Sequence, residues 1–346
     1  MQARDRPQAP DAPPGPRAFL VGTAKNEGPY LLEWVAHHLE VGFTDIALYQ
    51  NDSDDLTHEI LRGLAGIGAI RYAPNPAPAG AHQIRAYTRA ARLPAYGAAD
   101  LAMALDLDEM LVVKVGAGRL ADLVQAAPDF DAMTINWRLF GHSGKKLIGF
   151  DLQSERFTMC DYPLGGADHF NAWKALFRPQ LFARPGVHMP PDLETEAEGL
   201  RIVNGSGLPR EAYQIRNYNS TDPGGQALVQ INHYLVRDLD SFLLKSRRGS
   251  AHQDHRIIGL RYWAMRNRNY VRDTAILPFV PRIRARMAAL DQASGGRLMR
   301  LRRQAIARHK ARAEALRDDP EAARLRRACA RFEGHVPLHG PLPDAL

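Results

Sequence analysis

Two aspartates separated by one residue, Asp106 and Asp108, follow an apolar stretch that begins at Leu101. The stretch predicts a buried β-strand that carries both carboxylates on one face at its C-terminal end and Glu109 on the other, because side chains alternate along a strand. Carboxylates beside a buried strand are costly unless a cation neutralises them. Mg²⁺ takes one or two carboxylates and completes its shell with water and phosphate oxygens. The pair therefore predicts a divalent cation that carries a phosphate ester.

An acidic loop without function is the alternative, because a D-x-D tripeptide is common by chance. Two more polar clusters bear on the choice: residues 23–27 follow a predicted strand at 17–23, and residues 51–55 follow another at 46–49. Ligands of parallel α/β sheets bind beyond the carboxyl ends of the strands. Three polar clusters at three such ends favour a binding site over a chance tripeptide.

The elements that must position these clusters alternate between strand and helix. Further strands are predicted at 69–72, 101–110, 131–137 and 227–234, and helices at 30–41, around 60–64, 82–93, 239–245 and 257–270. The early alternation predicts an α/β fold whose first four strands are parallel and joined by right-handed crossovers. We expect the stretch from about 145 to 209 to be irregular.

Composition is typical of a globular protein: 346 residues, 45% hydrophobic and 24% charged. No apolar run approaches the roughly 20 residues that span a bilayer. Residues 1–16 lack the apolar core of a secretory signal and predict a disordered leader. Cys160 and Cys329 provide no disulfide or metal framework. These features predict a cytoplasmic protein.

The net charge of +7 is concentrated near the C-terminus. Residues 282–331 hold 15 Lys and Arg against 5 Asp and Glu, a net +10, which leaves −3 for the rest of the chain. The helix predicted around 298–308 has a narrow apolar stripe among its arginines. Such a helix can lie on an anionic membrane, or it can pack on the body through that stripe. Nucleic acid is disfavoured because the tail lacks interleaved aromatic residues.

Several motifs, in order and at plausible spacing, resemble the glycosyltransferase family 2-like proteins of the GT-A fold, and most of all those related to family 92 (the "domain of unknown function 23" proteins). The resemblance covers residues 17–250, leaving the leader and a helical C-terminal region, 251–346, that includes the basic tail. The motifs are Lys25-Asn-Glu27, Tyr30-Leu-Leu-Glu-Trp34, His37-His38, Gly42, Gln50-Asn-Asp-Ser-Asp-Asp55, Leu105-Asp-Leu-Asp-Glu109, Asn136-Trp-Arg138, Phe140-Gly141 and Asn232-His-Tyr234.

The resemblance implies a GT-A-type, Rossmann-like mixed sheet with flanking helices and a helical C-terminal extension. It implies a metal-dependent glycosyltransferase that moves a sugar from a nucleoside-diphosphate sugar, UDP-linked by frequency among similar enzymes, to a hydroxyl of a glycan or lipid-linked acceptor with inversion. Mn²⁺ or Mg²⁺ would be held by Asp106, Asp108 and His233 and would neutralise charge on the leaving diphosphate. The nucleotide-sugar-binding residues would be Thr23, Asn26, Glu27, Asp52, Arg85 and Asp106.

Inversion also needs a general base that reaches the acceptor hydroxyl. Asp168 is the preferred candidate because His169, Phe170, Trp173 and Lys174 surround it in sequence, and sugars pack on aromatic rings. Asp151, Glu155, Asp192 and His188 are the other candidates.

Two different functions compete with this hypothesis. One is a D-x-D phosphatase, although that motif normally opens its fold and here ends the fourth predicted strand. The other is a protein that uses the basic tail to bind a membrane surface or nucleic acid. A dinucleotide enzyme is less consistent, since the turn at 22–28 lacks the G-x-G-x-x-G pattern.

Overall fold

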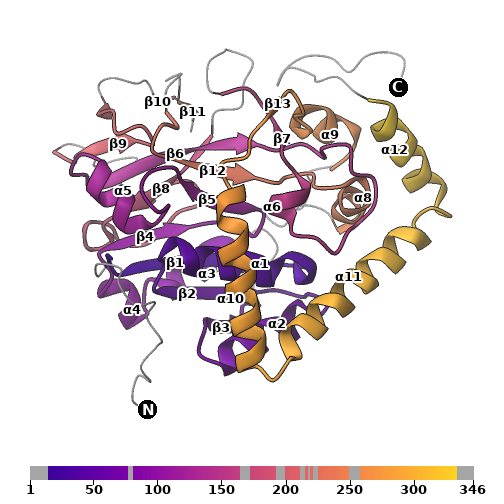
Figure 1. The fold of residues 1–346 in the computed structure, drawn as a ribbon, viewed down its shortest axis with the longest axis horizontal. Coiled ribbons are helices and arrows are strands. Elements are labelled where there is room, and N and C mark those ends of the chain that lie inside the picture. Colours follow the sequence, from indigo (N-terminus) through magenta and orange to yellow (C-terminus); the bar gives the residue numbers. More distant parts are fainter. Residues whose placement is uncertain are drawn as a thin grey trace.

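A single mixed sheet forms the centre of the computed structural model (Figure 1). The structure describes residues 15–76, 81–163, 172–191, 199–210, 215–216, 219–220, 225–248 and 258–332. The strands lie in the order β3-β2-β1-β4-β8-β6-β12-β5, and β9 pairs with β6. Their bounds are β1 Ala18–Ala24, β2 Asp45–Gln50, β3 Arg71–Pro74, β4 Leu101–Ala104, β5 Glu109–Val113, β6 Ala132–Leu139, β8 Trp173–Phe177, β9 Ile202–Asn204 and β12 Val229–His233.

The first four strands are parallel, as the alternating sequence pattern predicts. β1 pairs with β2 on one side and β4 on the other, and β2 pairs with β3. The connecting helices are α1 Gly28–Val41, α2 Thr57–Gly66, α3 His82–Ala90 and α4 Pro94–Gly97. The carboxyl ends of β1, β2 and β4 therefore lie at one edge of the sheet, which brings their polar clusters to that edge.

The second half of the sheet is mixed, which agrees with the predicted fold class. β8 runs antiparallel to both β4 and β6, β12 runs parallel to β6, and β5 closes the sheet antiparallel to β12. The expectation of an irregular region at 145–209 is wrong for residues 173–177, because β8 is a central and fully buried strand. Prolines after the strand and a lysine within it conceal the apolar pattern in the sequence.

Helices cover both faces of the sheet, so successive residues of β1 enter different cores. Leu20 belongs to the cluster beneath α1, whereas Phe19 and Val21 belong to the cluster beneath α3. A strand buried on both faces lacks polar alternation, which explains why β1 appears in the sequence as a continuous apolar run.

Shorter elements complete the molecule: α5 Leu120–Ala126, α6 Gln153–Arg156, β7 Met159–Cys160, η1 Pro179–Leu181, β10 Ile215–Arg216, β11 Asn219–Ser220, α8 Leu239–Arg248, α9 Leu260–Arg266, β13 Val271–Arg272 and η3 Leu277–Phe279. The helix predicted at 257–270 is shorter in the structure, because the chain leaves α9 at Asn267 to pair β13 with β7.

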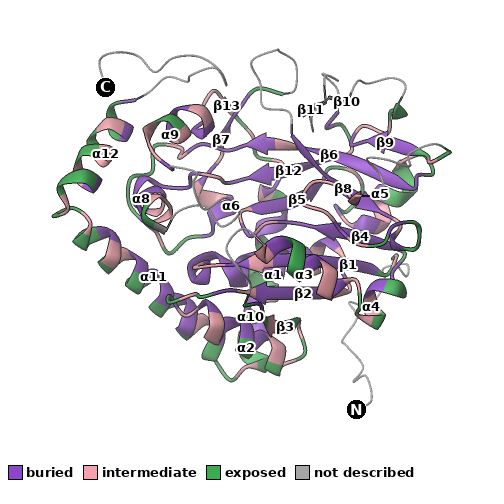
Figure 2. Ribbon diagram, turned by 180° about the vertical axis from the view of Figure 1, so that it is seen from behind, coloured by how far each residue is buried: buried purple, intermediate pink, exposed green. Residues whose placement is uncertain are grey.

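The basic C-terminal segment is helical, as predicted, and packs on the body. It forms α10 Val280–Ala293, α11 Arg297–Ala315 and α12 Pro320–Arg331. Leu298, Leu301 and Ala305 of α11 join the same core as α1, so the apolar stripe of this helix is buried and its arginine-rich side faces out (Figure 2). In the described part of the chain, no helix combines the length and apolarity needed to cross a bilayer.

Candidate functional site

The two aspartates lie in a turn rather than in a strand. β4 ends at Ala104, β5 begins at Glu109, and Asp106 and Asp108 occupy the turn between them. The indole Nε1 of Trp34, on α1, donates to the carbonyl oxygens of Asp106 at 3.1 Å and Glu109 at 2.7 Å, which fixes the turn on the body. The predicted alternation, with Glu109 facing away, is wrong because strand periodicity stops where the chain turns.

The Asp106 carboxylate is engaged on both oxygens. Gln83 Nε2, from α3, donates to Oδ1 at 2.7 Å, and Lys174 Nζ, from β8, donates to Oδ2 at 3.1 Å. Lys174 also lies 3.4 Å from Glu109 Oε2, so one buried ammonium serves two carboxyl groups. Burial alone would lower the pKa of Lys174, but Asp106 and Glu109 outweigh burial and raise it.

Glu109 is a fully buried carboxyl whose pKa lies well above its usual range, because burial outweighs the attraction of Lys174. Its Oε2 accepts from the backbone N–H of Asp106 at 2.7 Å. Its Oε1 has no hydrogen-bond partner among the described residues and lies 3.9 Å from His233 Nδ1, which lacks one as well. Glu109 therefore supports the turn and also faces His233.

Asp108 lies between a histidine and a second lysine. His233 Nε2, at the end of β12, is 3.4 Å from Asp108 Oδ1, and Lys245 Nζ, from α8, donates to Oδ2 at 3.1 Å. Burial alone would raise the pKa of Asp108, but Lys245 and His233 hold it well below its usual range. Burial lowers the pKa of His233, so its imidazole is neutral at neutral pH. An anionic oxygen and a neutral imidazole nitrogen thus face each other.

The turn after β1 is tied to the aspartate turn through Arg237, four residues beyond β12. Arg237 Nη1 lies 2.8 Å from Glu27 Oε2, Nη2 donates to the Leu107 carbonyl at 3.2 Å, and the guanidinium packs on the Tyr30 ring at 3.6 Å. All three side chains are buried. Glu27, a predicted nucleotide-sugar contact, therefore has a structural partner within the protein.

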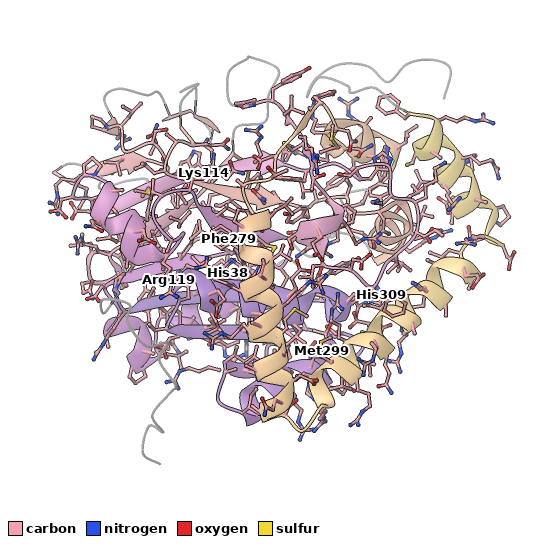
Figure 3. All side chains as sticks on the ribbon, viewed as in Figure 1. His38, Lys114, Arg119, Phe279, Met299 and His309 are labelled. Atoms are coloured by element: carbon pink, nitrogen blue, oxygen red, sulfur yellow. The ribbon has the colours of Figure 1, made fainter. Side chains whose placement is uncertain are left out.

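The loop after β2 is held by helix starts and by α11. Asp55 Oδ2 accepts from the Gly28 N–H at 3.0 Å and lies 2.7 Å from His309 Nε2 (His309 is labelled in Figure 3). Its Oδ1 accepts from the N–H and hydroxyl of Thr57. One buried carboxylate thus satisfies the first turns of both α1 and α2.

Asp54, the neighbouring residue, is also engaged. Arg312 Nη1 donates to its Oδ1 at 2.7 Å, and this hydrogen bond lowers the pKa of Asp54. Its backbone N–H donates to Asn26 Oδ1 at 2.9 Å, and the Asn26 N–H donates to Ser53 Oγ at 3.1 Å. Asn26 therefore joins the loops after β1 and β2.

The other predicted contacts differ in position. Thr23 is near the end of β1, opposite Tyr49 of β2. Asp52 is exposed, with a left-handed backbone at φ 48°. Arg85 is on the exposed side of α3, where it lines a surface hollow with Thr88, Arg89 and Arg92.

Of the candidate bases, Asp168 and Asp192 lie outside the described residues. Asp151 is exposed, and Glu155 pairs with Arg284 of α10. His188 lies beside the site, because its ring is 5.4 Å from that of Trp137, which is in turn 4.3 Å from that of His233.

The protonation of His188 follows from its contacts. Its Nδ1 is 2.9 Å from the Trp173 carbonyl oxygen, which can only accept, so Nδ1 carries the proton. Burial and the Lys174 charge lower the pKa of His188 and keep the ring neutral. Nε2 therefore carries a lone pair.

Asp108 and His233 fit a divalent cation as a two-residue donor set. Their facing atoms are 3.4 Å apart, near the roughly 3 Å that separates neighbouring ligands around a cation with bonds of about 2.1 Å. Among the described residues, no group of three or more His, Cys, Asp or Glu side chains is arranged to hold a metal ion. Asp106, the third predicted ligand, is instead engaged by Gln83 and Lys174.

Sequence analysis did not assign the two lysines to this site. Lys174 interrupts the apolar run 172–177, and a lone lysine in such a run is the signal that a buried carboxylate needs a partner. Lys245 gives no comparable signal, because it lies in an ordinary amphipathic helix. No sequence pattern indicates a role for Arg237 either, because it is the fold that places this residue next to Glu27.

No protein-family model and no curated protein sequence matches the chain. Among solved structures, TarS 1–349 from S. aureus matches over 88% of this chain and 92% of that chain, at 11% identity and a TM-score of 0.33. TarS 1–349 in complex with UDP-GlcNAc covers the same shares at 12% identity and a TM-score of 0.34. A further TarS structure matches over 86% of this chain and 55% of that chain, at 10% identity and a TM-score of 0.32. Similarity at this level does not define function, so the site geometry has to carry the proposal.

Proposed function

We propose that the protein is a glycosyltransferase that uses a nucleoside-diphosphate sugar, with UDP as the expected nucleotide. The observation that carries the proposal is the aspartate turn at the carboxyl edge of the sheet, where Asp106 and Asp108 lie next to Lys174, Lys245 and His233. A site for a diphosphate leaving group needs positive charge held in place in a partly buried pocket. The family resemblance of the motifs at 25–34, 50–55 and 105–109 supports the same function.

The chain's own residues can manage the charge that builds on the leaving diphosphate. Asp106 and Glu109 hold Lys174, and Asp108 holds Lys245, so both ammonium groups are positioned before substrate binds. Preorganised cations stabilise developing charge without further reorganisation. Asp108 and His233 would hold Mn²⁺ or Mg²⁺, which supplies Lewis-acid stabilisation of the phosphate oxygens. Glu109, on the other side of the His233 ring, would orient this histidine.

The nucleoside is expected to bind over the loops after β1 and β2. Asp52 has an exposed carboxylate there, and Asn26 links the two loops. Thr23 and Arg85 complete the proposed contacts. Asp54 and Glu27 are already paired with Arg312 and Arg237, so we assign them to holding the loops in shape.

For the acceptor side we propose inversion at a glycan or lipid-linked hydroxyl, with Asp168 as the base predicted from sequence. Among the described residues, His188 is the alternative, because its neutral ring carries a lone pair on Nε2 and it lies near Trp137 and His233. A general base must reach the attacking hydroxyl directly or through one water.

Asp108→Asn tests the proposal. With Mn²⁺, release of nucleoside diphosphate from a panel of UDP-, GDP- and dTDP-sugars should identify a donor for the unaltered protein. The variant should lose at least about 100-fold of that turnover, because it removes an anionic ligand while keeping the shape of the side chain. Asp318→Asn, at an exposed carboxylate on the C-terminal segment, is the matched control and should keep full turnover. Undiminished turnover in Asp108→Asn would refute the assignment.

A further inference from the structure

The loop between β6 and α6 exposes two large apolar side chains. Leu147 is 56% exposed and Phe150 is 50% exposed, which places them among the most exposed apolar residues of the described chain. Ile148, between them, is buried against Ile306 and Ala313 of α11. The loop is therefore attached to the body by its middle residue and presents the two flanking residues to solvent.

Hydrogen bonds to the backbone hold this loop in place. Arg302, buried on α11, donates from Nη1 and Nη2 to the Phe150 carbonyl at 3.0 Å, and Arg156 Nη2 donates to the Leu147 carbonyl at 2.6 Å. The exposure of Leu147 and Phe150 thus belongs to a fixed loop. Neighbouring exposed apolar side chains on a fixed loop can form part of an interaction surface when other features of that surface support it.

Lysines lie beside both apolar side chains, next to Leu147 in the sequence and over the ring of Phe150. Lys145 and Lys146 precede Leu147 and are exposed, and Lys310 Nζ lies 4.2 Å from the Phe150 ring centroid. Arg303 is exposed two turns before Lys310, on the same side of α11. Two exposed carboxylates are close in sequence to these residues: Asp151 follows Phe150, and Glu314 is one helical turn after Lys310. Four cations less two carboxylates leave a local charge of +2.

We propose that this surface, defined by Leu147, Phe150, Lys145, Lys146, Arg303 and Lys310, docks the protein on an anionic lipid bilayer. Shallow insertion of one or two apolar side chains beside cations is how peripheral proteins hold an anionic membrane. Two apolar residues are too few for a stable dimer, which buries about 800 Å² per partner, and like charges oppose self-association. The proposal goes beyond the transferase activity and does not depend on it.

The proposed membrane surface differs from the one that the basic tail predicts. Leu298, Leu301 and Ala305, the apolar stripe of the tail helix, are buried against the body and are not available to lipid. Lys310 and Arg303 remain on the outer side, next to a loop that supplies the apolar side chains. The membrane surface therefore combines two segments more than 150 residues apart in the sequence.

Co-sedimentation of the full chain with vesicles tests the proposal. The protein should pellet with vesicles of phosphatidylcholine and phosphatidylglycerol at low salt, but not with phosphatidylcholine alone, and high salt should release it. The double variant Leu147→Ser and Phe150→Ser should bind at least about tenfold more weakly. Lys145→Glu with Lys146→Glu should weaken binding to a similar extent.

The matched control is the double variant Val124→Ser and Leu181→Ser, which removes two other exposed apolar side chains and should bind as the unaltered protein does. Circular dichroism establishes that each variant is folded. The proposal would be overturned if the Leu147→Ser, Phe150→Ser variant and the Val124→Ser, Leu181→Ser control pelleted equally. It would also be overturned if the unaltered protein did not pellet at low salt. A concentration-dependent dimer that Leu147→Ser and Phe150→Ser abolish would overturn it in favour of a second copy.

Discussion

The loop after β2 and the turn after β4 lie on the same side of the sheet and are both rich in carboxylates, yet their carboxylates have different partners. In the β2 loop, Asp55 is fixed by helix-start N–H groups and His309. In the turn after β4, the Nζ atoms of Lys174 and Lys245 donate hydrogen bonds to Asp106 and Asp108, respectively. Glu109 Oε1 and His233 Nδ1 have no hydrogen-bond partner among the described residues.

This difference indicates that the carboxylates after β2 stabilise the fold, whereas those after β4 are available for the proposed chemistry. Backbone N–H groups at helix starts are fixed donors, and a carboxylate bound to them cannot leave without uncapping a helix. The ammonium groups of Lys174 and Lys245 are side-chain donors, so replacing their carboxylate partners uncaps no helix. A buried polar atom without a protein partner needs an explanation, such as a water, an ion or a catalytic role. We therefore expect substitution of Asp55, after β2, to lower stability and substitution of Asp108, after β4, to lower turnover. Lys174, which pairs with the aspartate turn from β8, should affect stability.

Lys174→Met should have the largest effect on stability. Removing one buried ammonium leaves Asp106 and Glu109 close together without a counter-charge, which we expect to cost about 3–5 kcal/mol of unfolding free energy. Urea unfolding measures the change. Because Glu109 already has a raised pKa, the deficit should shrink as the pH falls and the carboxyl groups take up protons.

Two further variants sharpen this prediction. Adding Glu109→Gln to Lys174→Met should restore part of the loss, because the double change removes both a cation and an anion. Lys146→Met, at an exposed lysine, should change stability by no more than about 0.5 kcal/mol. If the Lys174→Met protein were as stable as the unaltered one, Lys174 would not stabilise the carboxyl groups of Asp106 and Glu109.

The next largest effect is expected for Asp55→Asn, which should lower the unfolding free energy by about 2–3 kcal/mol. The substitution removes the charge of a carboxylate that accepts hydrogen bonds from His309, Gly28 and Thr57. Burial alone would raise the pKa of Asp55, but the hydrogen bonds from His309 and Thr57 leave it below the usual value. A depressed pKa adds stability that is present above the unfolded pKa of about 3.9 and is lost as the pH falls through the folded value. The difference between the two proteins should therefore narrow below about pH 4.

Turnover should distinguish Asp55→Asn from Asp108→Asn. At a temperature where Asp55→Asn stays folded, its turnover should remain close to normal, whereas Asp108→Asn should lose turnover and stay folded. The reverse pattern would exchange the roles assigned to the two carboxylates.

The sequence predicts the sheet well where the apolar periodicity is clear and polar residues mark the ends of the elements. β1, β2, α1 and α2 occur where predicted, because apolar runs or periodic apolar positions mark them and the loops between them are polar. β4 begins where predicted but ends at Ala104, before the two aspartates. β8 escapes prediction because its order in the sheet is set by non-local pairing with β4 and β6, and its five residues include a lysine.

The site is predictable only in part, for a related reason. Asp106 and Asp108 are singled out because two carboxylates follow an apolar run, whereas the role of His233 comes from the family resemblance. Their partners come from elements separated by up to 137 residues, as Lys245 is from Asp108, and no local pattern reports such a contact. The buried stripe of α11 shows the same limit, since periodicity predicts an apolar face without indicating whether protein or lipid covers it.

The smallest expected effect separates two residues of the β2 loop itself. Asp52→Asn should weaken nucleotide binding by about three- to tenfold, since it removes an exposed carboxylate proposed to accept from the nucleoside, and Asn also tolerates the left-handed backbone. Asp54→Asn should leave the affinity unchanged, because that carboxylate is already paired with Arg312. Calorimetric titration of both variants with the nucleoside diphosphate of the identified donor measures the difference. Equal affinities would mean that the whole β2 loop is structural and that the nucleoside binds elsewhere along the sheet edge.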